Sequence, residues 1–208
     1  MRKKVGLIFQ SPVDQLFEES VFKEISFGLR QEKNLSPREI EERVKDLWRE
    51  LHLPLEDLMD RSPFELSQGE RIMVAIASVL ISKPEVLVFD EPCAGLDPNN
   101  RSEVLHQIEI LHRNKKTLII LSNQCQGLIH LFDRVMFLHQ GKVITQGRLE
   151  DLLASGEIDR RVTDLLPPLT RMLIHLREKG IKVIPSFDPP SSVSLEIHRL
   201  LEKKRDNQ

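Results

Sequence analysis

Short runs of hydrophobic residues alternate along this chain with segments in which hydrophobic residues recur every three or four positions. Continuous hydrophobic runs that end in polar or turn-forming residues are typical of strands in the interior of a parallel sheet. Runs of this kind occupy residues 5–9, 86–89 and 117–121. Two further runs, at 134–138 and 142–144, flank the turn residues His139-Gln140-Gly141. The pattern predicts three buried strands followed by a hairpin.

Helical segments lie between the predicted strands. Ser36 with Glu39, and Ser67 with Glu70, have the Ser-x-x-Glu spacing of a helix capping box. The segment after Ser67 is hydrophobic on nearly every side, which is typical of a buried helix. Helices are predicted from Ser36 to about Leu51, from Ser67 to about Ile81 and from Asp97 to about His112, with an amphipathic helix around Leu169, Leu173 and Leu176.

The order of these elements predicts the fold class and the domains. Alternating helices and continuously hydrophobic strands indicate an α/β domain with a parallel sheet core, here followed by an antiparallel edge. Proline-containing segments that interrupt regular structure occur after Leu153 and include residues 186–192. We therefore expect a main domain over residues 1–155, with a helical subdomain at about 20–82, and a small helical C-terminal extension over 156–208.

Composition narrows the possible functions. The 208 residues carry a formal net charge of −2 and are 40% hydrophobic, which supports a sizeable core. A near-neutral chain offers no electrostatic case for binding nucleic acid. Cys93 and Cys125 have neither a CxxC partner nor a histidine at zinc-ligand spacing. No hydrophobic run approaches the ~20 residues of a membrane-spanning helix.

Two adjacent carboxylates, Asp90 and Glu91, follow directly on the predicted strand at 86–89. An aspartate at a strand end can hold a magnesium ion, and a neighbouring glutamate can polarise an attacking water. The alternative is two acidic residues that cap a surface turn.

A second candidate site is the helix start at Ser67-Gln68-Gly69-Glu70. A serine hydroxyl, a glycine backbone and a helix N-terminus together suit an anion such as phosphate. The alternative is an ordinary capping box, which many helices have.

The stretch "ELSQGERIMVAIASVLISKPEVLVFDEPCAGLDP" sets both candidate sites at a specific spacing. It resembles the signature motif, Walker B strand and D-loop of ATP-binding-cassette (ABC) ATPases, with the same order and spacing over residues 66–98. Upstream, "VGLIFQSPVDQLFEESVFKEISFG" resembles their Q-loop region, and "LLPPLTRMLIHLREKGIKV" is similar to the C-terminal segment of energy-coupling-factor ATPase subunits. The resemblance covers roughly residues 4–185.

This resemblance implies a P-loop NTPase-like fold, ATP and Mg²⁺ as ligands, and a role for each matching residue. Asp90 and Gln10 would hold the magnesium ion, and Glu91 would be the general base for water. Ser67 and Gly69 would contact the γ-phosphate of an ATP bound to the opposite ATPase subunit, and Asp97 would lie at the interface of the two subunits.

The chain also departs from the family pattern. No segment matches G-x-x-x-x-G-K-[ST], the glycine-rich phosphate loop, and Gly141-Lys142 stands in a predicted turn before a strand rather than before a helix. In the family this loop precedes the Q-loop, so we expect an N-terminally truncated domain that binds Mg-ATP weakly, if at all, and is inactive in isolation. A late start codon, a gene fragment and a chain encoded in two pieces remain open explanations.

Three further departures concern individual residues. Asn123 stands where the family has its switch histidine; it can donate a hydrogen bond to phosphate but has no titratable proton. Gln68 replaces a signature glycine and Glu70 a glutamine. An acid near an ATP γ-phosphate is unfavourable, unless Glu70 faces back as a capping-box partner.

Two functions follow from the resemblance. The first is the ATP-binding subunit of an energy-coupling-factor importer for a metal ion or vitamin, at the cytoplasmic face of the membrane, with a second ATPase subunit and a transmembrane subunit as partners. The second is a degenerate, non-hydrolytic subunit that completes the site of a partner ATPase. A cassette ATPase that acts on DNA is disfavoured, because the sequence shows neither a coiled coil nor a DNA-binding appendage.

Overall fold

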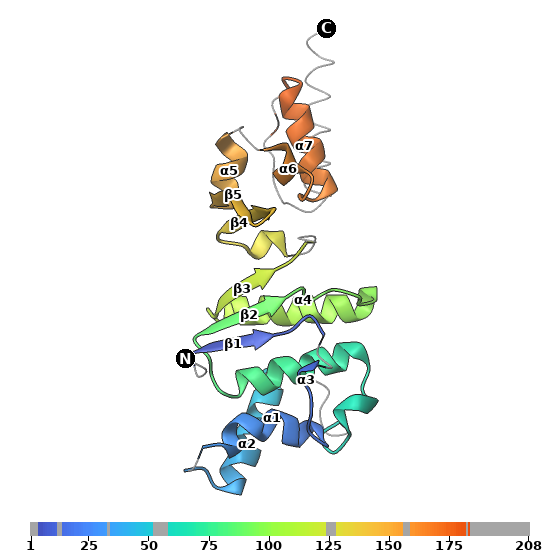
Figure 1. The fold of residues 1–208 in the computed structure, drawn as a ribbon, viewed down its shortest axis with the longest axis vertical. Coiled ribbons are helices and arrows are strands. Elements are labelled where there is room, and N and C mark those ends of the chain that lie inside the picture. The colour runs from blue at the N-terminus through green and yellow to red at the C-terminus, as the bar shows by residue number, and fades with distance from the viewer. Residues whose placement is uncertain are drawn as a thin grey trace. The chain divides into compact units, whose positions relative to one another are not determined.

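Figure 1 shows the fold of the computed structural model, which describes residues 4–11, 14–32, 34–51, 58–123, 128–155, 159–181 and 183. The proline-rich stretch at residues 186–192 lies outside these ranges. The chain divides into two compact units, residues 1–122 and residues 123–208.

The first unit is built on a three-stranded parallel sheet. Strand β2 (Val86–Asp90) lies between β1 (Val5–Ile8) and β3 (Thr117–Leu121), and it pairs in parallel with both. The parallel sheet core predicted from the continuous hydrophobic runs is therefore confirmed.

The two faces of this sheet have different surroundings. On one face, Leu87 and Phe89 are fully buried and Ile8 is 1% exposed. On the opposite face the side chains remain 41–50% exposed, namely Val5, Leu7, Ile119 and Leu121. The described residues thus cover one face of the sheet and leave a hydrophobic surface on the other.

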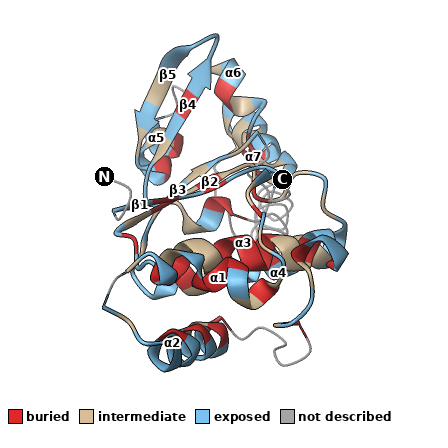
Figure 2. Ribbon diagram, turned by 60° about the horizontal axis from the view of Figure 1, so that its bottom comes forward, coloured by how far each residue is buried: buried red, intermediate tan, exposed pale blue. Residues whose placement is uncertain are grey.

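The helices of the first unit are α1 (Val21–Arg30), α2 (Pro37–Glu50), the short 3₁₀ helix η2 (Pro63–Glu65), α3 (Gln68–Leu80) and α4 (Pro98–Arg113). Helices α2, α3 and α4 begin directly after the predicted caps Ser36, Ser67 and Asp97, whereas no separate start was predicted for α1 or η2. Both predicted capping boxes form, at the starts of α2 and α3. Helix α3 is buried along most of its length (Figure 2), as expected for a helix that is hydrophobic on nearly all sides.

Helix α3 approaches the sheet closely at Gly6 in β1. A Cβ at this position would lie 2.2 Å from Val79 Cγ1 and 3.1 Å from Leu87 Cδ2. Because β1 carries no side chain there, α3 can pack directly against the strand backbone. Gly6 is thus a packing requirement, since its φ does not lie in the left-handed region.

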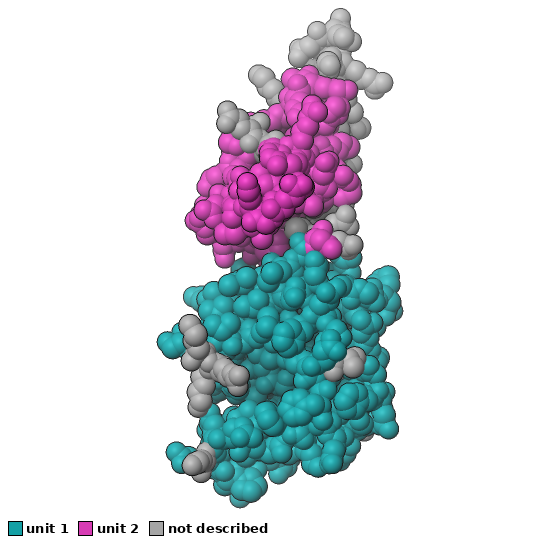
Figure 3. Space-filling view, viewed as in Figure 1, with its two compact units in different colours: residues 1–122 teal, residues 123–208 magenta. Residues whose placement is uncertain are grey.

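Figure 3 shows the second unit, residues 123–208, in magenta. This unit contains the hairpin and the C-terminal helices. After the 3₁₀ helix η3 (Ile129–Leu131), β4 (Val135–His139) and β5 (Lys142–Gly147) form a separate two-stranded antiparallel sheet, followed by α5 (Leu149–Ser155), α6 (Arg160–Thr163) and α7 (Pro168–Glu178). Gln140 and Gly141 both adopt positive φ angles in the hairpin turn, as tight hairpins require.

The expectation that this hairpin forms an edge of the parallel sheet is wrong. Phe137 of the hairpin is buried instead in a cluster within the second unit, with Ile129, Leu149, Leu153, Val162 and Leu166. Met136, Leu138 and Val143 of the hairpin stay 50–59% exposed. The division between the two compact units falls between residues 122 and 123. The boundary near residue 155 between a main domain and a C-terminal extension stays a prediction.

None of the helices among the described residues is long and hydrophobic enough to cross a membrane.

Replacing Gly6 with Ala tests the close approach of α3 to the sheet. The added methyl group collides with Val79, so we expect the free energy of unfolding to fall by about 1–3 kcal/mol in a denaturant titration. Val79→Ala in the same chain removes the colliding methyl and should recover part of this loss. Additive effects of the two substitutions would contradict the proposed contact, and Ser102→Ala on the exposed side of α4 serves as a neutral control.

Candidate functional site

Several candidate residues gather at the carboxyl edge of the parallel sheet. Asp90 is the last residue of β2, Glu91 follows it, and Gln10 comes two residues after the end of β1. Because β1 and β2 run in parallel with Ile8 opposite Phe89, their following residues leave the sheet at the same edge. Parallel sheets commonly bind ligands at this edge.

The backbone of Glu91 is held against the end of β3. Its N–H donates to the Leu121 carbonyl at 2.9 Å, and the Ser122 hydroxyl donates to Glu91 Oε2 at 3.1 Å. Glu91 has a φ of 46°, in the left-handed region that non-glycine residues seldom adopt. Ser122 was not among the residues predicted from sequence; its place directly after β3 is the signal that could have found it.

Described residues on both sides of Gln10 in the chain make contacts that hold them in place. Gln10 itself is exposed, whereas the preceding Phe9 donates its N–H to Gln15 Oε1 at 3.3 Å. Leu16, further along the loop, is 4% exposed and so anchors this segment in the core.

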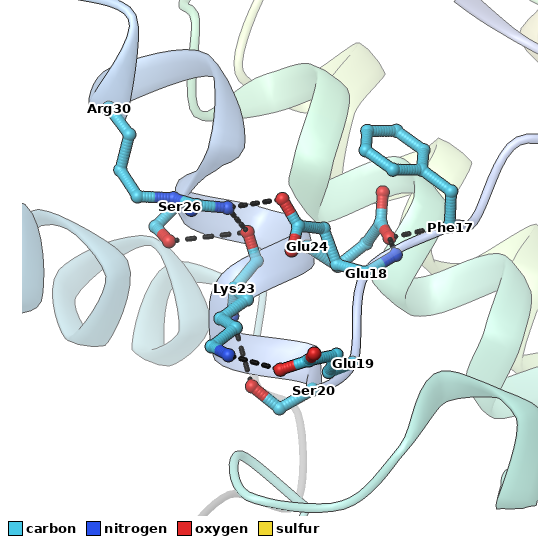
Figure 4. Close-up of polar contacts among 8 residues, drawn as sticks. All are labelled: Phe17, Glu18, Glu19, Ser20, Lys23, Glu24, Ser26 and Arg30. Carbon is cyan, nitrogen blue, oxygen red and sulfur yellow. Dashed lines mark hydrogen bonds and ion pairs between the residues drawn. The ribbon is translucent and has the colours of Figure 1, made fainter.

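Glu24 on α1 holds the end of the same loop (Figure 4). It is 3% exposed, and its Oε2 accepts hydrogen bonds from the backbone N–H groups of Phe17 and Glu18, both at 2.8 Å. A buried carboxyl group that accepts two backbone donors removes the cost of leaving them unsatisfied. Glu24 therefore joins the Gln10 loop to the first helix.

Arg30, at the end of α1, reinforces this connection. Its guanidinium forms an ion pair with Glu18 and donates to the Lys23 carbonyl at 2.8 Å (Figure 4). It also lies over the Phe27 ring, 5.7 Å from the centroid, and that ring meets Phe17 edge-on at 4.9 Å. The loop end and the helix thus share one polar and aromatic network.

A second group of candidate residues lies at the start of α3. Ser67 is its N-cap: Ser67 Oγ accepts the Glu70 N–H at 3.3 Å, and Glu70 Oε2 accepts the Ser67 N–H at 2.7 Å. The Glu70 carboxyl group therefore faces back onto the capping box, the arrangement in which its charge is least unfavourable to a bound phosphate.

Asp97 caps α4 and lies beside this helix start. Its carboxylate accepts the N–H groups of Asn99 at 2.9 Å and Asn100 at 3.1 Å, and it also accepts the Asn100 side-chain amide. The backbone N–H of Asn100 is the largest cause of an Asp97 pKa below its ordinary value, and the Asn100 side chain and the Asn99 N–H act in the same direction.

Asn100 also connects Asp97 with Gly69. A Cβ added to Gly69 would lie 2.2 Å from Asn100 Oδ1 and 2.7 Å from its Cγ. The Gln68 side chain makes a second connection, since its Nε2 is 3.6 Å from the Cβ position of Gly95. The structure thus brings the signature-like segment and the Asp97 loop into one packed surface.

Asn123, predicted at the switch-histidine position, is exposed and directly follows Ser122. It is the first residue of the second compact unit. Its role stays a prediction, as do the roles of the other candidate residues.

Among the described residues, no cluster of three or more His, Cys, Asp or Glu side chains comes together that could hold a metal ion. Magnesium in nucleotide sites is commonly held by one or two carboxylates together with phosphates and water. The strand-end carboxylate of Asp90 fits such a shared site, whereas it does not by itself make a protein-only metal cage.

Known proteins resemble this chain over most of its length. The ABC transporter family model matches residues 1–94. The energy-coupling factor transporter ATP-binding protein EcfA2 of Clostridium tetani is 38% identical over 208 residues, covering 100% of this chain and 72% of the relative. Its counterpart from Clostridium acetobutylicum is 37% identical over 206 residues, covering 99% of this chain and 72% of the relative.

A solved structure shows the same fold. The chain resembles cbiO1 from Clostridium perfringens, described as part of the ABC transporter complex cbiONQ, with a TM-score of 0.65 and 35% identity over 85% of this chain and 68% of that one. Fold and motif order thus define an ATP-binding-cassette ATPase domain. Within that class, the chain belongs to the family of energy-coupling factor transporter ATP-binding proteins.

Glu24→Leu tests whether the buried carboxyl group holds the Gln10 loop. The change leaves two backbone donors without their acceptor, so we expect the free energy of unfolding to fall by about 2–4 kcal/mol and the Phe17 and Glu18 amides to exchange faster with deuterium. Glu24→Gln keeps an acceptor oxygen and should preserve most of both properties. Glu19→Leu, at an exposed neighbour, is the control; equal effects of the Gln and Leu variants at Glu24 would contradict the inference.

Gly69→Ala tests the contact between the two helix starts. The added Cβ overlaps the Asn100 side chain, so a loss of about 1–3 kcal/mol in unfolding free energy is expected. Asn100→Ala should relieve the overlap, which gives a coupling energy of at least about 0.5 kcal/mol in a double-mutant cycle. In the matched cycle of Gly69→Ala with Asn99→Ala, the two losses of unfolding free energy should add. If the losses also add for Gly69→Ala with Asn100→Ala, the contact between Gly69 and Asn100 is absent.

Proposed function

We propose that this chain is the ATP-binding subunit of an energy-coupling-factor importer, in which ATP binding and hydrolysis drive transport of a metal ion or a vitamin. Its relatives are energy-coupling factor transporter ATP-binding proteins, and a structural neighbour is part of an ABC transporter complex. The chain works as a peripheral subunit at the cytoplasmic face of the membrane, bound to a second ATPase subunit and to a transmembrane subunit.

In the proposed mechanism the carboxyl edge of the sheet holds the reacting end of ATP. Asp90 and Gln10 hold the magnesium ion, and Glu91 accepts the proton of the water that attacks the γ-phosphorus while ADP leaves. Asn123 donates a hydrogen bond to a phosphate oxygen. The observation that carries this proposal is the position of Glu91, tied to the end of β3 beside Asp90 at the edge where parallel sheets bind ligands.

The surface around Ser67 serves the opposite subunit in this proposal. Ser67 and Gly69 contact the γ-phosphate of an ATP held by the partner, and Asp97 lies in the interface. The N-terminus of α3 supports this role because its backbone donors and helix dipole favour an anion. ATP that binds between two subunits stabilises the closed pair, and hydrolysis releases it.

A second candidate is a non-hydrolytic subunit that completes the partner's site. Asn123 favours it, because an amide cannot take up the proton that a histidine can. In this function the Ser67 surface is used and Glu91 takes no part in chemistry.

Glu91→Gln separates the two functions. The chain is assembled with the ATPase and transmembrane subunits of its transporter, and the partner ATPase carries Gln in place of its own catalytic glutamate. The remaining turnover then reports the site of this chain. We expect Glu91→Gln to lower that turnover about 100-fold or more, since general-base catalysis contributes about 10²–10⁴.

Glu85→Gln, at an exposed residue directly before the same strand, should leave turnover unchanged. Equal turnover with and without the Glu91 carboxylate would rule out hydrolysis by this chain and favour the second candidate.

A further inference from the structure

At the ends of β2 and β3, the last residue of each strand and the residue that follows it lie beside their counterparts in the other strand. Asp90 pairs with Leu121 in the parallel register, so the next residues, Glu91 and Ser122, are neighbours across the sheet edge. The Glu91 N–H donates to the Leu121 carbonyl at 2.9 Å, and the Ser122 hydroxyl donates to Glu91 Oε2 at 3.1 Å. Glu91 is thus held through both its backbone and its side chain.

The backbone of Glu91 needs such support. A non-glycine residue in the left-handed region is strained, and conformations of this kind persist where the surroundings fix them. The bond to the Leu121 carbonyl fixes the main chain, and with it the direction in which the Glu91 side chain leaves the strand end. That hydrogen bond does not fix the rotation of the carboxyl group. This rotation is the χ3 torsion of glutamate, which has broad energy minima.

We propose that Ser122 is the positioning residue that orients the Glu91 carboxylate for water activation. The Ser122 hydroxyl donates a hydrogen bond to Glu91 Oε2. This bond selects one rotamer of the Glu91 side chain and so fixes the direction in which Oε1 points. A hydrogen bond to an ionised carboxylate is stronger than one between neutral groups. This inference rests on the proposed role of Glu91.

A serine is suited to this task by its length. Its hydroxyl lies one carbon from the backbone, so a serine directly after β3 reaches only a group held at the adjoining strand end. Ser122 is half-buried, which shields the contact in part from competing water. The two residues are 31 positions apart in the sequence, and the pairing of β2 with β3 brings them together.

The test compares Ser122→Val with Ser122→Thr, two side chains of nearly equal shape of which only threonine keeps the hydroxyl. In the assembled transporter with the partner's catalytic glutamate replaced, Ser122→Val should lower kcat about tenfold and leave KM for ATP within about twofold. Ser122→Thr should restore kcat to within about threefold of the original chain. Thr117→Val, which removes a hydroxyl at the exposed start of β3, is the control for hydroxyl loss.

A second readout needs neither ATP nor turnover. The side-chain carboxyl ¹³C resonance of Glu91 in the 208-residue chain is assigned by its disappearance in Glu91→Gln. This resonance should shift in Ser122→Val and stay close to its original position in Ser122→Thr and Thr117→Val. An unchanged resonance in Ser122→Val would overturn the inference, because the hydroxyl would then not bind the carboxylate.

Failure of this inference is distinguishable from failure of the proposed function. If Glu91→Gln abolishes turnover while Ser122→Val leaves kcat unchanged, Glu91 is the base and Ser122 does not position it. If Glu91→Gln leaves turnover unchanged, the proposed hydrolysis fails, and with it the positioning role. If Ser122→Val lowers kcat as much with Gln at position 91 as with Glu, Ser122 acts by another route and the inference is overturned.

Discussion

The arrangement of the first unit depends on the parallel pairing of β2 with a strand on each side. Leu87 and Phe89 are both fully buried beneath the helices, so the strand has one acceptable register. A shift by one residue would turn these side chains to the exposed face. Because the register is fixed by core packing, the two carboxylates that follow the strand are delivered to the sheet edge at a fixed height beside Leu121 and Ser122.

Helix capping places the second group of candidate residues. Ser67 and Asp97 each satisfy backbone donors at the start of a helix, which is a structural need that exists with or without a nucleotide. The same caps bring the Ser67 hydroxyl and the Asp97 carboxylate to the starts of two neighbouring helices, where Asn100 of α4 lies close to Gly69 of α3. The departure at Glu70 is compatible with phosphate binding nearby, because its carboxyl group is already engaged by Ser67.

Buried polar groups connect these surfaces with the helices around them. Glu24 accepts two backbone donors of the loop after Gln10, and the buried Gln107 of α4 donates to the Leu51 carbonyl at the end of α2 at 2.7 Å. Such bonds are costly to break in a protein interior, so they hold loops and helix ends in definite places. The hydrophobic face of the sheet formed in part by Leu7 and Ile119 contrasts with this, since the described residues leave it exposed.

The sequence by itself determined the local structure and the kind of site. Hydrophobic periodicity and capping residues depend on neighbours in the chain, so the strand before Asp90 and the helix starts at Ser67 and Asp97 could be predicted and are confirmed. Motif spacing indicated the family. Only the tertiary structure decided where the hairpin packs, because a side chain such as Phe137 can be buried against any hydrophobic surface. In the structure, Phe137 packs in a cluster with residues that follow it in the chain, among them Leu149 and Leu153. Three contacts likewise depend on the tertiary structure: Ser122 with Glu91, Asn100 with Gly69, and Glu24 with the loop before α1. The first depends on the register of two strands, the second on how two helices pack, and the third on the path of a loop.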